Sequence, residues 1–196
     1  MQKDLKTPNI LTGTGFVIAF AGTLSGILPS IIGAILILAG LYMLSESLSL
    51  KAFERALISF LIAFISVVIF FTLILKSIVG LIFGSFKLSP AIIAISGMTF
   101  LLGFLISYIL SLISAYFFFR AMSEVSEAIK HPLILLSGVV VLIGAATIIV
   151  FGFGIVIIAI GLLIGAIAFF TAPTELKVSE YSPPDLPPEK ELPPGR

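Results

Sequence analysis

The fold of this chain is decided by residues 116–131, which read Tyr-Phe-Phe-Phe-Arg-Ala-Met-Ser-Glu-Val-Ser-Glu-Ala-Ile-Lys-His. Here a long apolar segment, residues 91–119, becomes charged without any break in helical spacing. Pro132 then ends the helix, because its ring disfavours helical geometry at the preceding residue and removes a backbone donor. The stretch therefore predicts a membrane-crossing helix that continues into a charged foot.

The charged foot carries its side chains at helical spacing. Arg120 and Glu124 stand four residues apart, and Glu127 stands three before Lys130, so each pair is expected to meet on one helical surface. An earlier apolar segment ends in a similar Leu-Ser-Glu at 44–46, at an offset of 78 residues from Met-Ser-Glu at 122–124. A candidate cytoplasmic interaction foot is therefore formed by Glu46, Arg120, Glu124 and Glu127.

The composition excludes a soluble domain. Of 196 residues, 59% are hydrophobic and 11% are charged, with a mean hydropathy of +1.27. A helix needs roughly 20 apolar residues to cross a bilayer, and six stretches are long enough. Basic residues are few and scattered, so we expect no nucleic-acid partner. The chain has no cysteine, which excludes disulfides and thiolate metal sites.

The predicted fold is an all-α integral membrane protein with six transmembrane helices in residues 10–172. Two tight hairpins, helices 1–2 and helices 5–6, flank the longer helices 3 and 4. Residues 77–86 are too short to span and are expected to be re-entrant or to lie on the surface. The six helices are expected at 10–28, 30–47, 51–75, 91–119, 132–151 and 154–172.

The two ends of the chain differ in character. Residues 1–9 form a cytoplasmic segment, whose Lys3 and Lys6 precede an apolar run as they would in a signal peptide. Because the Thr-Gly-Thr-Gly sequence at 12–15 interrupts that run, we expect a retained helix. Residues 173–196 contain three Pro-Pro pairs among Glu and Lys, which predicts a disordered cytoplasmic tail.

The distribution of basic residues predicts the orientation. With the six helices at the expected positions, only Lys76 and Lys87 of the eleven lysines and arginines fall on the outer side of the membrane. The basic side of a membrane protein stays in the cytoplasm. We therefore expect a cell-membrane protein with both termini cytoplasmic.

Internal repetition links the two expected hairpins. Ile-Leu-Thr-Gly at 10–13 and Leu-Leu-Ser-Gly at 135–138 open segments of similar length, at an offset of 125 residues. At that offset Gly40 also falls on Gly165. The repeat predicts two similar hairpins that point the same way, unlike the inverted repeats of many transporters.

Small residues recur every three or four positions on three of the helices. Such faces let helix backbones approach closely in lipid, where no hydrophobic force drives association. A solute path lined by flexible helices is the functional alternative to this packing role. The candidate helix-packing residues are Gly15, Ala19, Gly22, Gly26, Ala56, Ser59, Ala63, Ser66, Gly161, Gly165 and Ala168.

The apolar spans lack the groups that coupled transport needs. Proton relays and ion-coupled sites use titratable side chains at depth, and every Asp and Glu lies at an expected cytoplasmic end or in the tail. His131 is the single histidine, so we do not expect a usual metal or haem site within one chain. We expect no other cofactor. A passive pore remains an alternative, lined by the hydroxyls of Ser59, Ser66, Thr72, Ser96, Ser107, Ser111 and Ser114.

The pattern resembles a known family. It is carried by Gly-Leu-Tyr-Met-Leu-Ser-Glu at 40–46, Ala-Phe-Glu-Arg-Ala-Leu at 52–57, Arg-Ala-Met-Ser-Glu-Val-Ser-Glu at 120–127 and Gly-Leu-Leu-Ile-Gly-Ala-Ile-Ala-Phe-Phe at 161–170. Over residues 8–172 the chain is similar to an uncharacterised multi-pass membrane family of archaea and bacteria, domain of unknown function 996. The resemblance implies a plasma-membrane protein and supplies no activity.

These observations favour a non-catalytic packing or accessory protein in a membrane assembly, either a homo-oligomer or one with another membrane protein. The lipid bilayer is its first partner. The alternative is a passive channel or carrier for a small solute. An enzyme is not expected, since only Glu124 and Glu127 could supply acid–base groups to a lipid substrate.

Overall fold

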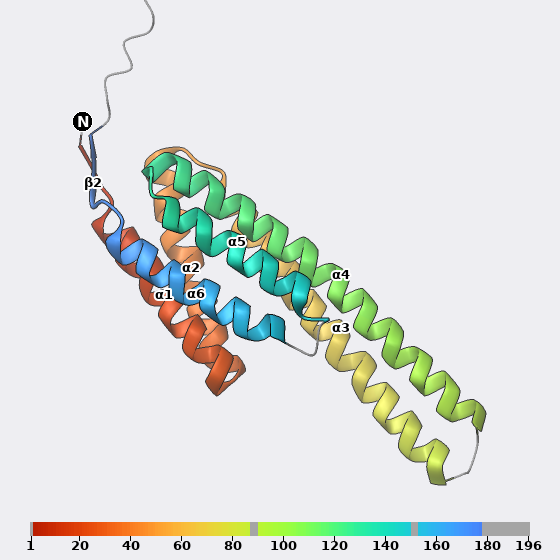
Figure 1. Ribbon diagram of the computed structural model, residues 1–196. Coiled ribbons are helices and arrows are strands. Elements are labelled where there is room, and N and C mark those ends of the chain that lie inside the picture. Colours follow the sequence, from red (N-terminus) through yellow and green to blue (C-terminus); the bar gives the residue numbers. More distant parts are fainter. Residues whose placement is uncertain (1, 87–89, 150–152, 178–196) are drawn as a thin grey trace, which may run out of the picture.

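The structure, a computed structural model, describes residues 2–86, 90–149 and 153–177 and is almost entirely helical (Figure 1). Two short strands, β1 (Gln2–Asp4) and β2 (Glu175–Lys177), lie at the two ends of the described chain. The helices are α1 (Lys6–Ser25), α2 (Ile27–Leu48), α3 (Ala52–Phe86), α4 (Pro90–Ile129), α5 (Pro132–Thr147) and α6 (Phe153–Thr171).

Helices α1 and α2 pack antiparallel through their small residues. A Cβ added at Gly15 would lie 2.6 Å from the backbone nitrogen of Ile37, and one added at Gly33 would lie 2.7 Å from the Cα of Ala19. Gly26 connects the two helices with φ +123°, a conformation that glycine adopts without steric cost. Close backbone approach therefore explains the glycines of this pair.

Helices α5 and α6 repeat that register. A Cβ at Gly144 would lie 2.7 Å from the backbone nitrogen of Ile158. Positions 144 and 158 lie 125 residues after Ala19 and Gly33, which contact each other in α1–α2. The 125-residue repeat expected from the sequence is thus visible as an equivalent contact in α1–α2 and α5–α6.

Helices α3 and α4 are much longer than the others. They contain 35 and 40 residues, about 52 and 60 Å at 1.5 Å per residue. The expectation that residues 77–86 form a separate re-entrant or surface-lying piece is wrong, because α3 continues through Lys76 to Phe86. Lys76 is exposed and interrupts nothing, whereas Gly84 faces the side chain of Ile92 on α4. The small face of α3 therefore keeps α4 as its partner beyond the lysine.

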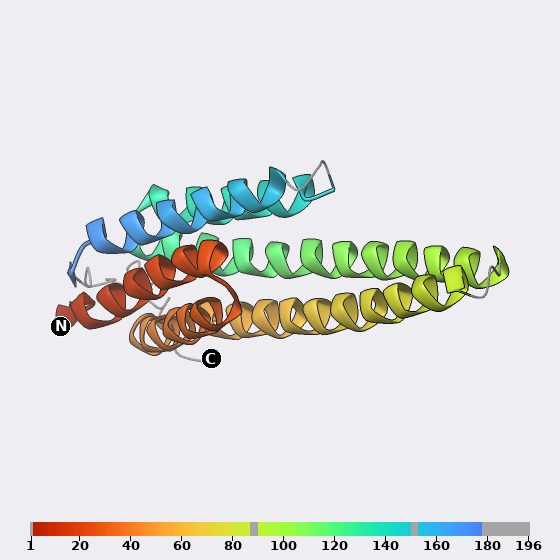
Figure 2. The same ribbon diagram turned by 90° about the horizontal axis from the view of Figure 1, so that it is seen from below.

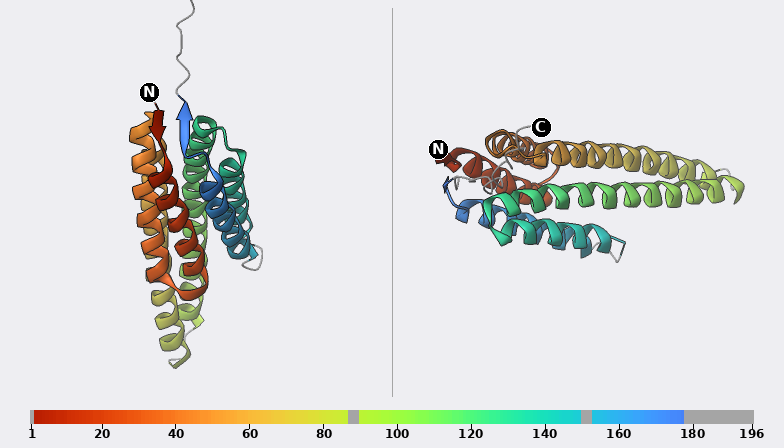
Figure 3. Two further views of the ribbon diagram at one scale, coloured as in Figure 1. Left: turned by 90° about the vertical axis from the view of Figure 1, so that its left-hand side faces the viewer. Right: turned by 90° about the horizontal axis from the view of Figure 1, so that it is seen from above.

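The six helices follow one another round a ring in chain order, and α1 closes it by packing against α6 (Figures 1 and 3). Only the half of α3–α4 that carries the foot takes part in this ring. Seen from below in Figure 2, the other half extends away from the remaining helices. Tyr108 marks the boundary, because its hydroxyl donates to the carbonyl of Ala146 (2.9 Å), next to the last residue of α5.

Within the part of the chain that the structure describes, four helices are long and apolar enough to cross a membrane: Ile27–Leu48, Ala52–Gly84, Pro90–Ile129 and Phe153–Thr171. α5 is apolar but shorter, at 16 residues. α1 is not among the four, and its first turns carry Lys6, Asn9 and two Thr-Gly pairs. By length and composition the chain is therefore a helical membrane protein with several candidate spans.

The ends of the chain meet beside the foot. β1 and β2 pair antiparallel, with Lys3 opposite Leu176. The amide of Leu5 donates to the carbonyl of Thr174 (2.8 Å). α1 begins at Lys6, within the segment expected to precede the first helix, and residues 175–177 of the expected tail form β2. The rest of that tail, residues 178–196, lies outside the described residues.

Candidate functional site

The charged foot is held together across helices. The carboxylate of Glu124 on α4 pairs with the guanidinium of Arg55 on α3 at 2.6 Å and accepts the Lys51 amide at 2.8 Å. It thus caps the first turn of α3, where amides lack helical partners and the helix dipole favours an anion. The expected pair of Glu124 with Arg120 is wrong, since no salt bridge joins them in the described chain. Glu124 faces α3, and Arg120 faces outward.

Glu127 also has a different partner from the expected one. Its carboxylate accepts a hydrogen bond from the hydroxyl of Ser123 (3.2 Å). Lys130 adopts φ +58° directly after the last residue of α4. Its backbone has therefore left the helix, and among the described residues its side chain forms no salt bridge with Glu127.

The two feet are equivalent, but at an offset of 81 residues rather than the expected 78. The Leu50 amide donates to the Ser45 carbonyl (3.0 Å), and the His131 amide donates to the Ser126 carbonyl (3.1 Å). The residue before each donor has positive φ, as in a Schellman helix end. The expected offset of 78 residues paired Glu46 with Glu124 because both follow a serine. The two are not equivalent, since Glu46 is exposed whereas Glu124 is half-buried and forms a salt bridge.

Two polar side chains at this end each have one buried atom without a hydrogen-bond partner. Asn9 donates through Nδ2 to the Pro173 carbonyl (3.2 Å), and its Oδ1 has no partner. His131 lies with Nε2 3.4 Å from the hydroxyl of Thr171, and its Nδ1 has no partner. Among the described residues, no group of three or more His, Cys, Asp or Glu is arranged to hold a metal ion.

Serine side chains join α3 to α4 inside the ring. Ser59 and Ser114 exchange hydrogen bonds, each hydroxyl donating to the carbonyl of the other residue (2.8 and 3.0 Å). One heptad further on, Ser66 and Ser107 form the same reciprocal pair (2.9 and 3.2 Å). Because both partners of each pair are satisfied, these serines act as interhelical contacts in apolar surroundings.

The other expected pore hydroxyls are also occupied. Ser111 lies 3.3 Å from the Ser66 hydroxyl. Thr72 and Ser96 each donate to the carbonyl four residues earlier in their own helix. Thus none of the seven hydroxyls is left free to line a polar path.

The remaining candidate packing residues lie in three settings. Gly161 faces Val141 of α5, and Gly165 faces the ring of Phe16. Ala56 and Ala168 are fully buried in the core. Gly22 approaches Ser30 in α2, whereas Gly26 has no atom within 4 Å of its added Cβ and therefore does not serve helix packing.

An aromatic cluster fills the ring next to the foot. Phe16 stacks on Phe169 with ring centroids 5.6 Å apart and meets the edge of Phe118 at 6.1 Å. Phe118 in turn contacts Phe60 at 6.3 Å. Sequence reasoning missed Phe16, which becomes central only when α6 packs beside it.

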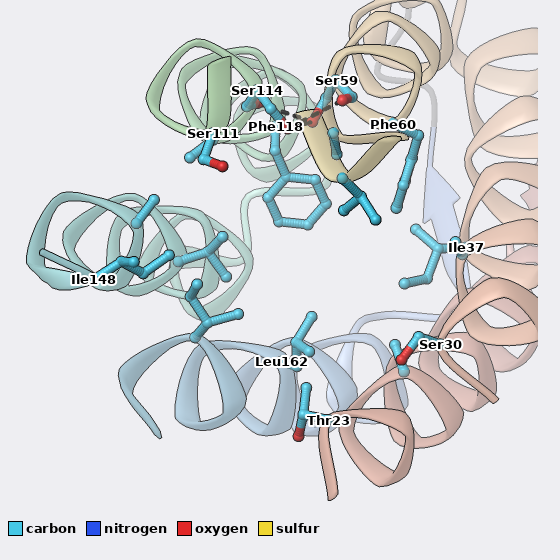
Figure 4. Close-up of a pocket in the computed structure, with 18 residues that line it drawn as sticks. Thr23, Ser30, Ile37, Ser59, Phe60, Ser111, Ser114, Phe118, Ile148 and Leu162 are labelled. Carbon is cyan, nitrogen blue, oxygen red and sulfur yellow. Dashed lines mark hydrogen bonds between the residues drawn. The ribbon is translucent and has the colours of Figure 1, made fainter. Parts of the chain in front are cut away.

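On the side of this cluster that faces away from the foot, the ring encloses a cavity. The cavity has a volume of about 320 Å³ and receives side chains from all six helices. Figure 4 shows them pointing inward around an open centre, with Phe118 and Phe60 on one side and Leu162 opposite. The lining residues are Ala19, Thr23, Ser30, Ala34, Ile37, Ser59, Phe60, Ala63, Val67, Ser111, Ser114, Ala115, Phe118, Val141, Ala145, Ile148, Ile158 and Leu162.

The cavity wall is apolar in effect. Five lining residues carry hydroxyls, and three of these, Ser59, Ser111 and Ser114, belong to the α3–α4 serine contacts. Thr23 donates to the Phe20 carbonyl (2.7 Å), and Ser30 donates to the Gly26 carbonyl (3.2 Å). No lining residue is charged. The surface therefore suits an apolar occupant and offers no catalytic group.

A family model matches the greater part of the chain. The model of a family described as a protein of unknown function, DUF996, matches residues 29–168. Neither the curated proteins nor the solved structures contain a significant match.

Proposed function

The chain belongs to the DUF996 family of proteins of unknown function, and we propose that it is a non-catalytic accessory component of a membrane assembly. In this proposal all six helices are embedded, the α1–α2 and α5–α6 hairpins flank α3–α4, and both termini face the cytoplasm. The assembly is a homo-oligomer or includes another membrane protein.

One observation carries the proposal: the half of α3–α4 beyond Tyr108 has no neighbour among the other described helices. Large apolar side chains cover its outside, and Phe86 and Leu101 are 84% and 67% exposed. Residues 90–107 of α4 extend about 27 Å past the ring at 1.5 Å per residue. A contiguous apolar surface of this size is typical of an interaction site.

The lengths favour protein over lipid as the cover for part of this surface. The apolar part of α4, residues 90–119, is about 45 Å long. A helix tilted by the usual 20° crosses a hydrocarbon core of about 30 Å in about 32 Å. About 13 Å of apolar helix therefore exceeds the membrane, and a second protein surface would keep it from water.

The alternative, a passive channel or carrier, needs a continuous polar path. All seven hydroxyls considered for such a path are hydrogen-bonded within the protein, which counts against it. A catalytic role for Glu124 is disfavoured in the same way, since its two oxygens are engaged by Lys51 and Arg55.

Cysteine cross-linking in native membranes tests the proposal, because the chain has no cysteine of its own. The variants Leu101→Cys and Phe71→Cys place thiols on the uncovered half, and Ile160→Cys on α6 is the matched control on an exposed ring position. We expect a discrete cross-linked species, identified by mass spectrometry, from the two far-half variants. Monomer alone from all three variants would refute an assembly at this surface.

A further inference from the structure

The cavity inside the ring runs from a closed end to an open end. Near the foot its wall is buried, as at Ile37, which is 1% exposed. At the other end Val67 is 47% exposed, and the lining residues Thr23 and Ile148 lie at the ends of α1 and α5. The cavity therefore opens at the end of the ring from which the uncovered half of α3–α4 emerges.

The surroundings of the opening are apolar. Leu24 is 78% exposed, and Ile27, Leu28, Phe64 and Phe153 are exposed as well. These side chains would contact hydrocarbon in a bilayer. A molecule that enters the cavity thus comes from an apolar phase.

Water is a poor occupant of this cavity. A buried water needs two to four polar partners, and the hydroxyls in the wall already donate their hydrogens within the protein, which leaves no donor for a water. The residues that line the cavity include no charged side chain and no amide side chain. An empty cavity is also unfavourable, because its cost rises with its volume.

From this geometry we propose that the ring cavity binds one hydrocarbon chain of a membrane lipid, with the headgroup left outside. Its volume of about 320 Å³ lies at the lower end of the range of about 300–1,000 Å³ for small-molecule pockets. The chain enters beside Val67 and Ile148 and ends against Phe118. Specificity rests on the apolar chain, since no basic residue lines the cavity to select a headgroup phosphate.

The first test uses variants that fill the cavity. Ala63→Phe and Ala145→Phe each place a ring inside it, whereas Ala94→Phe adds the same ring to an exposed position on α4. The full chain is purified in mild detergent, and retained lipid is measured by native mass spectrometry and by extraction. We expect about one lipid per protomer in the wild type and in Ala94→Phe, and at least a tenfold loss in the filled variants.

Thermal unfolding distinguishes a filled cavity from a damaged fold. Lipid added to delipidated protein should raise the unfolding temperature of the wild type and of Ala94→Phe. It should leave a folded Ala63→Phe or Ala145→Phe unchanged. Equal lipid retention by the filled and control variants would overturn the proposal, as would a wild type that carries detergent only.

A second test needs no variant and holds if the filled proteins do not fold. Phospholipids with a photoactivatable group near the end of one chain are reconstituted with the wild-type protein and irradiated. We expect adducts on the cavity residues Phe60, Phe118 and Leu162, at equal yield for two different headgroups. Adducts confined to exposed residues such as Leu101 would refute the site, and adducts from one headgroup alone would refute recognition by the chain.

Discussion

The two halves of the α3–α4 hairpin have similar apolar sequences and very different surroundings. In the foot half, four other helices cover the pair, Phe118 is buried, and serines bind across the interface. Among the described residues, the far half keeps only the contact between α3 and α4, for example where Gly103 meets Leu73. The comparison teaches that apolar composition places a helix in or near a membrane but does not say what covers it.

The aromatic cluster gives the largest expected contrast between the halves. Phe118→Ala should lower the free energy of unfolding by about 3–5 kcal/mol, because it empties a buried site between Phe16 and Phe60. Phe100→Ala in the exposed far half should cost under about 1 kcal/mol in the isolated chain. Unfolding by SDS titration in mixed micelles measures both. Equal losses would mean that the far half is covered as well.

Glycine-to-alanine changes should have opposite effects on stability in the ring and in the far half of α3–α4. Gly15→Ala should destabilise the protein by about 1–3 kcal/mol, because the new Cβ would overlap the backbone of α2. Gly97 has no atom within 4 Å of its added Cβ, so Gly97→Ala should stabilise α4 by about 0.5–1 kcal/mol. The same titration measures both variants. A destabilised Gly97→Ala in membranes, but not in detergent, would point to a partner surface at that position.

The foot sharpens the comparison through its charged residues. Glu124→Gln should cost about 1–2 kcal/mol, since it removes the ion pair with Arg55 and weakens the cap on α3. Glu46→Gln, on the equivalent helix end, should change stability by less than about 0.5 kcal/mol because Glu46 is exposed. Thermal unfolding in detergent at low and high salt measures both. A salt-independent Glu124 effect would argue that the ion pair contributes little.

The smallest expected effect concerns the serines. Ser59→Ala should cost about 0.6 kcal/mol, the average for a hydrogen bond between membrane helices. Ser96→Ala in the far half should be close to neutral, since that hydroxyl returns to its own helix. A double-mutant cycle of Ser59 with Ser114 isolates the pair. A coupling energy of zero would show that the serines matter through their small size alone.

Much of the fold was predictable from local chemistry. Pro132 predicts the start of α5, and the small-residue face of Gly15, Ala19 and Gly22 predicts close packing of α1 against a neighbouring helix. The continuation of α3 past Lys76 was missed, because hydropathy alone does not distinguish a lysine that ends a helix from one that extends sideways. Other features depend on how separate hairpins register: Glu124 meets Arg55, and the alanines at 63, 115 and 145 leave a common hollow. No pattern within a single helix indicates either feature.

The pairing of β1 with β2 has a consequence for the order of assembly during biosynthesis. Leu5 and Asn9 bind the backbone of Thr174 and Pro173, so α1 and α6 share one seam although α6 is synthesised much later than α1. At a translation rate of about 5–20 residues per second, α1 waits on the order of ten seconds or longer for α6. During this interval the ring is still open on the side that α6 later covers. The docking of α6 completes the apolar wall of the cavity, which stays open beside Val67 and Ile148.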